Sequence, residues 1–147
     1  MKYLHEFRFM ARDEARHVEF LSRYAELSTQ EIDHFRTMAR IAKMTDNTSK
    51  MKTAFQYLIK AYCTKAGINL CITNLPKYAT RRDDDVRDRV SAASIHDTMA
   101  QFGDVRDAVV YANTGYVWFR TKSDAERTHE LINNMMIEKN IIRTRVF

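Results

Sequence analysis

The sequence has few of the residues that interrupt regular secondary structure, with three glycines and one proline among 147 residues. Glycine and proline are the strongest local breakers of helices and strands, so their scarcity predicts a chain rich in helix. It also makes the positions of Gly67, Pro76, Gly103 and Gly115 informative, because each is expected to mark the end of an element or a special backbone geometry.

Cysteines and long apolar runs are also scarce. Cys63 and Cys71 are the two cysteines, without C-x-x-C spacing, which argues against a disulfide framework and predicts reduced thiols in a reducing compartment. No apolar run approaches the ~20 residues of a membrane span, and the first residues lack the apolar stretch of a signal peptide. We therefore expect an intracellular protein, in the nucleus or the cytoplasm, with no membrane partner.

The sequence lacks the common motifs of catalysis. There is no G-x-S-x-G, no glycine-rich phosphate loop and no internal repeat. His5, His96 and His129 are isolated, with no cysteine or carboxylate cluster at metal-ligand spacing. These absences favour a protein that is not an enzyme and that has no cofactor and no metal site.

The charge is moderately basic. Lysine and arginine total 24 against 19 acidic residues, a net charge of +5. Residues 1–66 hold 12 basic and 8 acidic side chains, whereas residues 67–147 hold 12 and 11. A basic balance favours an anionic partner such as nucleic acid, but many proteins with this charge bind none, so charge alone decides little.

Residues 1–66 show the spacing of amphipathic helices. A capping box is expected at Ser28–Glu31, and a polar break at 45–49 separates two further apolar-striped segments. Gly67 stands where a helix C-cap glycine belongs. This pattern predicts an N-terminal region of about three helices. Its first apolar stripe comprises residues three or four apart: Leu4, Phe7, Ala11, Val18, Leu21 and Ala25.

After Gly67 the apolar period changes from that of a helix to that of a strand. Ile68, Leu70 and Ile72 alternate with polar residues, which predicts a strand. A charged segment of mixed sign at 81–89 could contact phosphates, but it is interpreted as a solvated loop that leads into a helix ending near Gly103.

The remaining residues predict two strands, a helix and a last strand. The strands at 105–112 and 116–121 are joined by a turn at 113–115, and a capping box at 123–126 opens the next helix. The last strand covers 141–147. The order β-α-β-β-α-β predicts an α+β, ferredoxin-like domain over 67–147.

Two of these strands carry motifs of a known family. The segment Leu70–Leu75 resembles the RNP2 strand of the RNA recognition motif, and Thr114–Thr121 resembles its RNP1 strand. Residues 67–147 are thus similar to this family, and the resemblance implies binding of single-stranded RNA on the face of the sheet. The pattern departs from the family at Cys71, where an aromatic residue is usual, and at Thr114 and Thr121.

Strand alternation predicts which side chains line the RNA-binding face. If the apolar positions point into the core, then the neighbouring residues point outward. Two aromatic rings would stack on bases, arginines would hold phosphates or bases, and small polar residues would bond base edges. The expected RNA-binding residues are Tyr116, Trp118, Arg120, Arg143, Arg145, Asn69, Cys71 and Thr73.

Two other functions fit parts of the sequence. The first is a protein-interaction module, in which the protein's own N-terminal helices or a partner cover the sheet. The second is a ferritin-like di-iron protein, since Glu14/His17 and Glu31/His34 have Glu-x-x-His spacing. In a hairpin turning near Ser28, however, the two pairs would lie at levels ~15 Å apart, too far to share a metal cluster.

Overall fold

The computed structural model describes residues 12–80 and 87–147. The chain divides into two compact units, Met1–Ala66 and Gly67–Phe147. Each unit has its own secondary structure, helical in the first and mixed in the second. No helix among the residues that the structure describes is long and apolar enough to cross a membrane.

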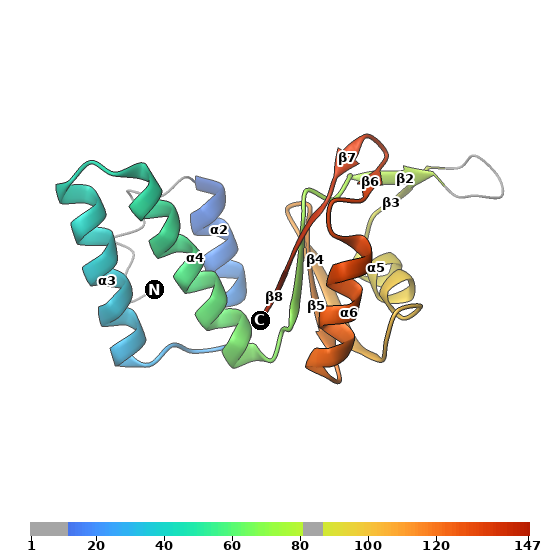
Figure 1. Ribbon diagram of the computed structural model, residues 1–147, viewed down its shortest axis with the longest axis horizontal. Helices are drawn as coiled ribbons and strands as arrows, with labels where there is room; N and C mark the ends of the chain where they lie inside the picture. Colours follow the sequence, from blue (N-terminus) through green and yellow to red (C-terminus); the bar gives the residue numbers. More distant parts are fainter. Residues whose placement is uncertain (1–11, 81–86) are drawn as a thin grey trace. The chain divides into compact units, whose positions relative to one another are not determined.

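The first unit contains three helices within its described part, residues 12–66: α2 (Arg12–Leu21), α3 (Thr29–Met44) and α4 (Thr48–Ala66) (Figure 1). Val18 and Leu21 of the predicted stripe are buried, whereas Leu4, Phe7 and Ala11 lie outside the described residues. The expected extension of this helix to Ala25 is wrong, because α2 ends at Leu21 and tighter turn hydrogen bonds follow it.

The predicted start of α3 and end of α4 are confirmed, whereas the break between them is shorter than the predicted 45–49, because α4 already begins at Thr48. The Ser28 hydroxyl accepts a bond from the Glu31 backbone N–H (3.2 Å), and the Glu31 carboxylate accepts one from the Ser28 N–H (2.9 Å). Gly67 follows α4 with a φ of +80°, a left-handed conformation that glycine adopts without steric cost. These local signals could be read from sequence because each involves neighbouring residues only.

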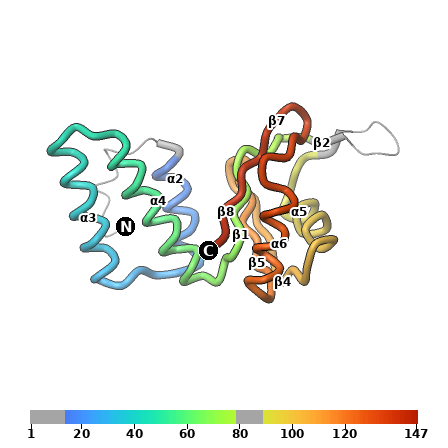
Figure 2. The backbone as a smooth tube through the Cα atoms, in the orientation of Figure 1, coloured from blue at the N-terminus to red at the C-terminus, as the bar shows by residue number. Residues whose placement is uncertain are grey.

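The second unit is built on a four-stranded antiparallel sheet, and α+β is therefore the observed class of this unit. Its strands are β1 (Leu70–Thr73), β4 (Val105–Tyr111), β5 (Thr114–Phe119) and β8 (Arg143–Val146), in the spatial order β4-β5-β1-β8. The last strand of the chain, β8, thus lies beside the first, β1 (Figure 2). The two strands with RNP-like sequences, β1 and β5, occupy the centre of the sheet.

Two helices, α5 (Ala92–Met99) and α6 (Lys122–Ile132), lie on one face of this sheet (Figure 1). The core between helices and sheet contains Leu70, Ile72, Val117 and Phe119, each at most 3% exposed. The alternation predicted from sequence is therefore confirmed for these four positions. Ile142 and Met99 belong to the same core.

Two small hairpins interrupt the six main elements of this unit. The strands β2 (Tyr78–Thr80) and β3 (Arg87–Arg89) pair between β1 and α5, so the expected loop at 81–89 is wrong for residues 87–89. A second hairpin, β6 (Met136–Ile137) and β7 (Asn140–Ile141), lies between α6 and β8. Residues 81–86 lie outside the described part. These strands are only two or three residues long, too short to show an apolar alternation from which to predict them.

Two predicted element boundaries are displaced by one or two residues. The turn between β4 and β5 is Ala112-Asn113, with φ values of +47° and +63°, while Thr114 and Gly115 belong to β5. Positive φ at both central residues is typical of two-residue hairpin turns that match strand twist. The expected capping box at 123–126 is also wrong, since the N-cap of α6 is Thr121.

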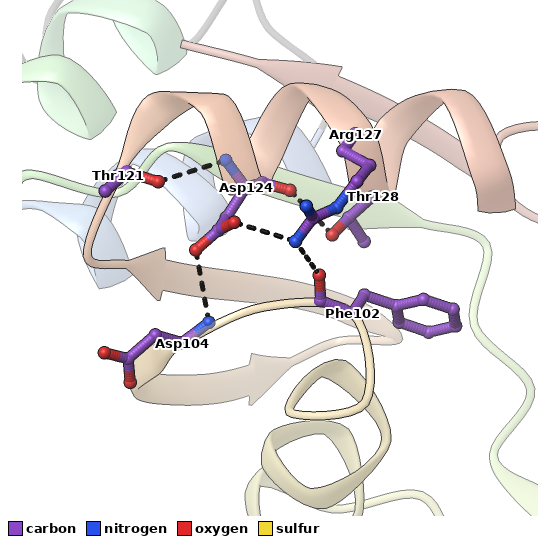
Figure 3. Close-up of polar contacts among 6 residues, drawn as sticks. All are labelled: Phe102, Asp104, Thr121, Asp124, Arg127 and Thr128. Carbon is purple, nitrogen blue, oxygen red and sulfur yellow. Dashed lines mark hydrogen bonds and ion pairs between the residues drawn. The ribbon is translucent and has the colours of Figure 1, made fainter.

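Asp124, in the first turn of α6, ties that helix to the turn that precedes β4 (Figure 3). Its carboxylate accepts bonds from the Asp104 backbone N–H (3.2 Å) and from Arg127 (2.8 Å). Arg127 also donates to the Phe102 carbonyl (2.6 Å). A Cβ at Gly103 would lie 2.8 Å from Asp124 Cβ and Cγ, so glycine permits this close approach.

Candidate nucleic-acid interface

The face of the sheet opposite α5 and α6 carries the side chains that alternate with the core positions. Strand register places Val109, Tyr116, Cys71 and Arg145 in one row across all four strands. Successive residues of a strand point to opposite faces, so residues two apart share one. This outer face therefore combines aromatic, polar and basic side chains, whereas the core face is apolar.

A second row lies two residues further along each strand. It contains Trp118 on β5, which pairs with the exposed Asp107 on β4. Trp118 is half-buried, and the Cβ position of Gly67 would be 3.7 Å from its Cδ1 atom. The helix-ending glycine thus lies close to the edge of the indole. Tyr116 and Trp118 are neighbours on one strand and one face, as the sequence predicted.

Tyr116 and Cys71 differ from the expectation of an open face, because they are 1% and 4% exposed. They lie directly opposite each other on the two central strands. Burial raises the pKa of the Cys71 thiol to about 12, although the nearby Arg145 guanidinium acts to lower it. Alternation determines the face to which a side chain points, but not whether solvent reaches that face.

The side chains of Asn69 and Thr73 are already engaged within the sheet. The Asn69 amide donates to the Phe119 carbonyl (2.8 Å) and accepts from the Phe119 N–H (2.9 Å). The Thr73 hydroxyl donates to the Arg143 carbonyl (3.3 Å). The Asn69 amide acts as an extension of the β1–β5 pairing, a role that does not suit the expected contact with base edges.

The three predicted arginines have different surroundings. Arg143 is exposed, and Arg145 is half-buried with its guanidinium 5.1 Å from the Phe147 ring centroid. Arg120 forms an ion pair with Asp104 (2.7 Å), in which both side chains are well exposed. Arg143 and Arg145 share β8 and the outer face, while Arg120 follows the end of β5. The sheet thus brings two of the three arginines onto one edge strand.

Several outer-face residues escaped sequence reasoning. Tyr111 and Val109 on β4 share the face of Tyr116, and Phe147 follows β8 beside Arg145. Alternation along β4 did not identify Val109 and Tyr111, because this strand has apolar residues at both even and odd positions. Its outward face becomes clear only from its pairing with β5. Phe147 was interpreted as the end of a strand rather than as a ring beside an arginine.

The Glu-x-x-His pairs serve other contacts where the structure describes them. Glu31 accepts the capping bond and forms an ion pair with Lys65 (2.6 Å). Burial acts to raise the pKa of its carboxyl group, but the bonds from Lys65 and Ser28 together outweigh it and lower the pKa. The His34 ring lies 4.6 Å from that of Tyr57. Within residues 12–80 and 87–147 no group of three potential ligands is placed to hold a metal.

Comparison with known proteins finds likeness at the level of structure. No family model and no curated protein matches the sequence. Similar solved structures include the RNA recognition domains 1 and 2 of sex-lethal from Drosophila melanogaster (11% identity, TM-score 0.44) and the C. elegans NONO-1 homodimer (18%, 0.44). Another is the second RRM domain of yeast poly(U)-binding protein (14%, 0.43).

These likenesses cover only part of the chains compared. Each of the three covers 54% of this chain. The match spans 48% of the sex-lethal chain, 28% of the NONO-1 chain and 93% of the poly(U)-binding domain.

Proposed function

We propose that residues 67–147 form an RNA recognition motif that binds single-stranded RNA on the outer face of its sheet. The observation that carries the proposal is the position of Trp118 and Tyr116 on a central strand, with Tyr116 in the row that crosses to Arg145 on β8. Aromatic rings on the central strands and arginines beside them suit unpaired bases joined by phosphates.

Within this proposal the half-buried Trp118 is the first stacking platform. Its indole offers a flat apolar surface, and stacking of one base on such a ring contributes ~1–3 kcal/mol. Arg143 and Arg145 hold the phosphates that flank the stacked bases. The guanidinium of Arg145 near the Phe147 ring is suited to this role, because the ring restricts the arginine to a position beside the face.

Tyr116 has a conditional role in the proposal. Because it is 1% exposed, its ring stacks on a base only if binding uncovers it. The same holds for the neighbouring Cys71. RNA that stacks on both aromatic residues must therefore uncover the row that contains Tyr116 and Cys71. RNA that stacks on Trp118 alone can leave this row buried.

The direct test follows the fluorescence of Trp118, the only tryptophan of the chain. A mixed-sequence single-stranded RNA is expected to quench this emission saturably, and the apparent affinity should fall as salt rises, because phosphate contacts release counterions. Trp118→Phe serves as the spectral blank, with fluorescently labelled RNA as an independent probe. Absence of binding by both probes at low salt would exclude the proposal.

A protein-interaction module is the second candidate, and the burial of Tyr116 and Cys71 favours it. In this function the outer face is closed by protein and serves assembly rather than RNA recognition. The two candidates differ in what RNA does to the face. RNA that leaves both the Trp118 emission and the reactivity of Cys71 unchanged would favour the closed face.

A further inference from the structure

A cavity of about 570 Å³ lies at the end of the sheet where β4 turns into β5 and α5 begins. Three separate segments line it: the β2–β3 hairpin, the start of α5 and the β4–β5 turn. Its lining includes Lys77, Arg89, Ser91, Ala92, Val110 and Asn113. The cavity thus belongs entirely to the second unit and lies outside the face described above.

Backbone hydrogen bonds hold these segments together. The Val90 N–H donates to the Lys77 carbonyl (2.9 Å), which extends the pairing of β2 with β3 by one step. The Leu75 N–H donates to the Asn113 carbonyl (2.9 Å) and so ties the chain after β1 to the β4–β5 turn. Main-chain hydrogen bonds therefore connect residues on two sides of the cavity.

The lining has a consistent charge. Lys77 and Arg89 are both exposed cations, and none of the lining residues that the structure describes carries a carboxylate. Ser91 and Asn113 add polar groups, whereas Val110 and Ala92 add apolar surface. A cation pair beside small polar and apolar groups matches a phosphate joined to a ribose better than it matches a cation or a purely apolar ligand.

The position of the cavity relates it to the outer face. Tyr111 and Thr114 end the outer-face rows at the same turn whose next residues, Ala112 and Asn113, line the cavity. The turn thus connects the outer face to the cavity, which gives an RNA strand that leaves the sheet at this end a route to Lys77 and Arg89. The aromatic residues of such a sheet stack only two or three bases, so this contact requires a longer RNA.

We propose that this cavity binds a backbone phosphate of the same RNA strand, beyond the bases that stack on the sheet. The inference rests on the proposed function, and it makes Lys77 and Arg89, at the base of the β2–β3 pair, part of the RNA-binding surface. It predicts a binding site longer than the sheet alone provides.

The test compares a tetranucleotide with a nonanucleotide on the intact chain, using labelled RNA and a series of salt concentrations. The variant is Lys77→Gln/Arg89→Gln, and the matched control is Arg106→Gln/Lys122→Gln, which removes the same charges from exposed positions at the opposite end of β4 and the start of α6. For the nonanucleotide the variant should lower the slope of log affinity against log salt by about 1.4, since each single-strand phosphate contact contributes about 0.7.

Three results separate the possibilities. Loss of affinity for the nonanucleotide alone, with little change in the control variant, supports the cavity as a phosphate site. Equal losses in both variants, or equal losses for both RNA lengths, would overturn the inference and leave the sheet as the sole site. If the unmodified protein binds neither RNA, the proposed function itself fails. Circular dichroism of each variant checks that the fold is retained.

Discussion

The two faces of the sheet are built from the same strands yet obey different constraints. Toward α5 and α6, Phe119 and Val117 are fully packed in an apolar core. On the opposite face, Trp118 is half-buried and Tyr116 lies in a row with Arg145. Residues on the core face need only be apolar and pack well, because the helices remove them from water. The outer face mixes rings with charges, and packing within the sheet does not account for that mixture.

The largest expected contrast between the faces is in stability. Phe119→Ala should lower the free energy of unfolding by about 3–5 kcal/mol, because it removes a ring from a closed core. Trp118→Ala, one residue earlier, should cost less than half as much, since its ring is partly solvated in the folded state. Urea denaturation of both variants measures the difference. Similar losses would show that the outer face is as tightly packed as the core.

The next effect concerns the bond network that closes one end of the core face. Asp124→Ala should lower the free energy of unfolding by about 2 kcal/mol, because the Asp104 N–H and Arg127 lose a charged acceptor. Glu126→Ala, an exposed acid on the same helix, is the control and should change stability by less than about 0.5 kcal/mol. Equal effects in thermal unfolding would contradict a specific role for Asp124.

A smaller effect tests whether the outer face is closed at Cys71. Its folded pKa of about 12 lies above the ordinary thiol pKa of 9.0, so the folded state retains a proton that the unfolded state loses. Stability should therefore fall as pH rises from 9 toward 12, by about 1.4 kcal/mol per pH unit from this group. Urea unfolding near pH 8 and near pH 10 measures this loss. The free energy of unfolding should fall less between the two pH values in Cys71→Ala than in the unmodified protein.

The reactivity of the same thiol gives an independent measurement. In a Cys63→Ala background, Cys71 should react with a thiol reagent near pH 8 only as fast as the protein opens. Mass spectrometry follows the labelled fraction. Rapid labelling of the folded protein would show that the central row is open to solvent, which would favour RNA over protein on this face.

The smallest expected effect concerns the edge strand of the outer face. Arg143→Gln/Arg145→Gln should weaken RNA binding about tenfold or less and lower the salt slope by about 1.4. Stability should change little for Arg143, which is exposed. An unchanged salt slope in anisotropy titrations would remove these arginines from the site and weaken the distinction between the two faces.

Patterns among neighbouring residues were sufficient to predict the α+β class and much of the order of its elements. The period-two alternation through Leu70 and Ile72 located a central strand and its inward face, and Ser28 with Glu31 located a helix start. Each signal depends on residues within one turn or one strand. The candidate site was predictable to the same extent, because alternation placed Tyr116 and Trp118 on one face.

Only the tertiary structure decided what those residues do. Asn69 lies on the predicted face, yet its amide bonds the Phe119 backbone, a partner fifty positions away. Tyr116 and Cys71 are buried, although their strand pattern indicates an outward direction. The cavity at Lys77 and Arg89 arises where three separate segments meet. Sequence determines local conformation and periodicity, whereas burial, long-range bonds and cavities depend on which distant segments come together in the folded chain.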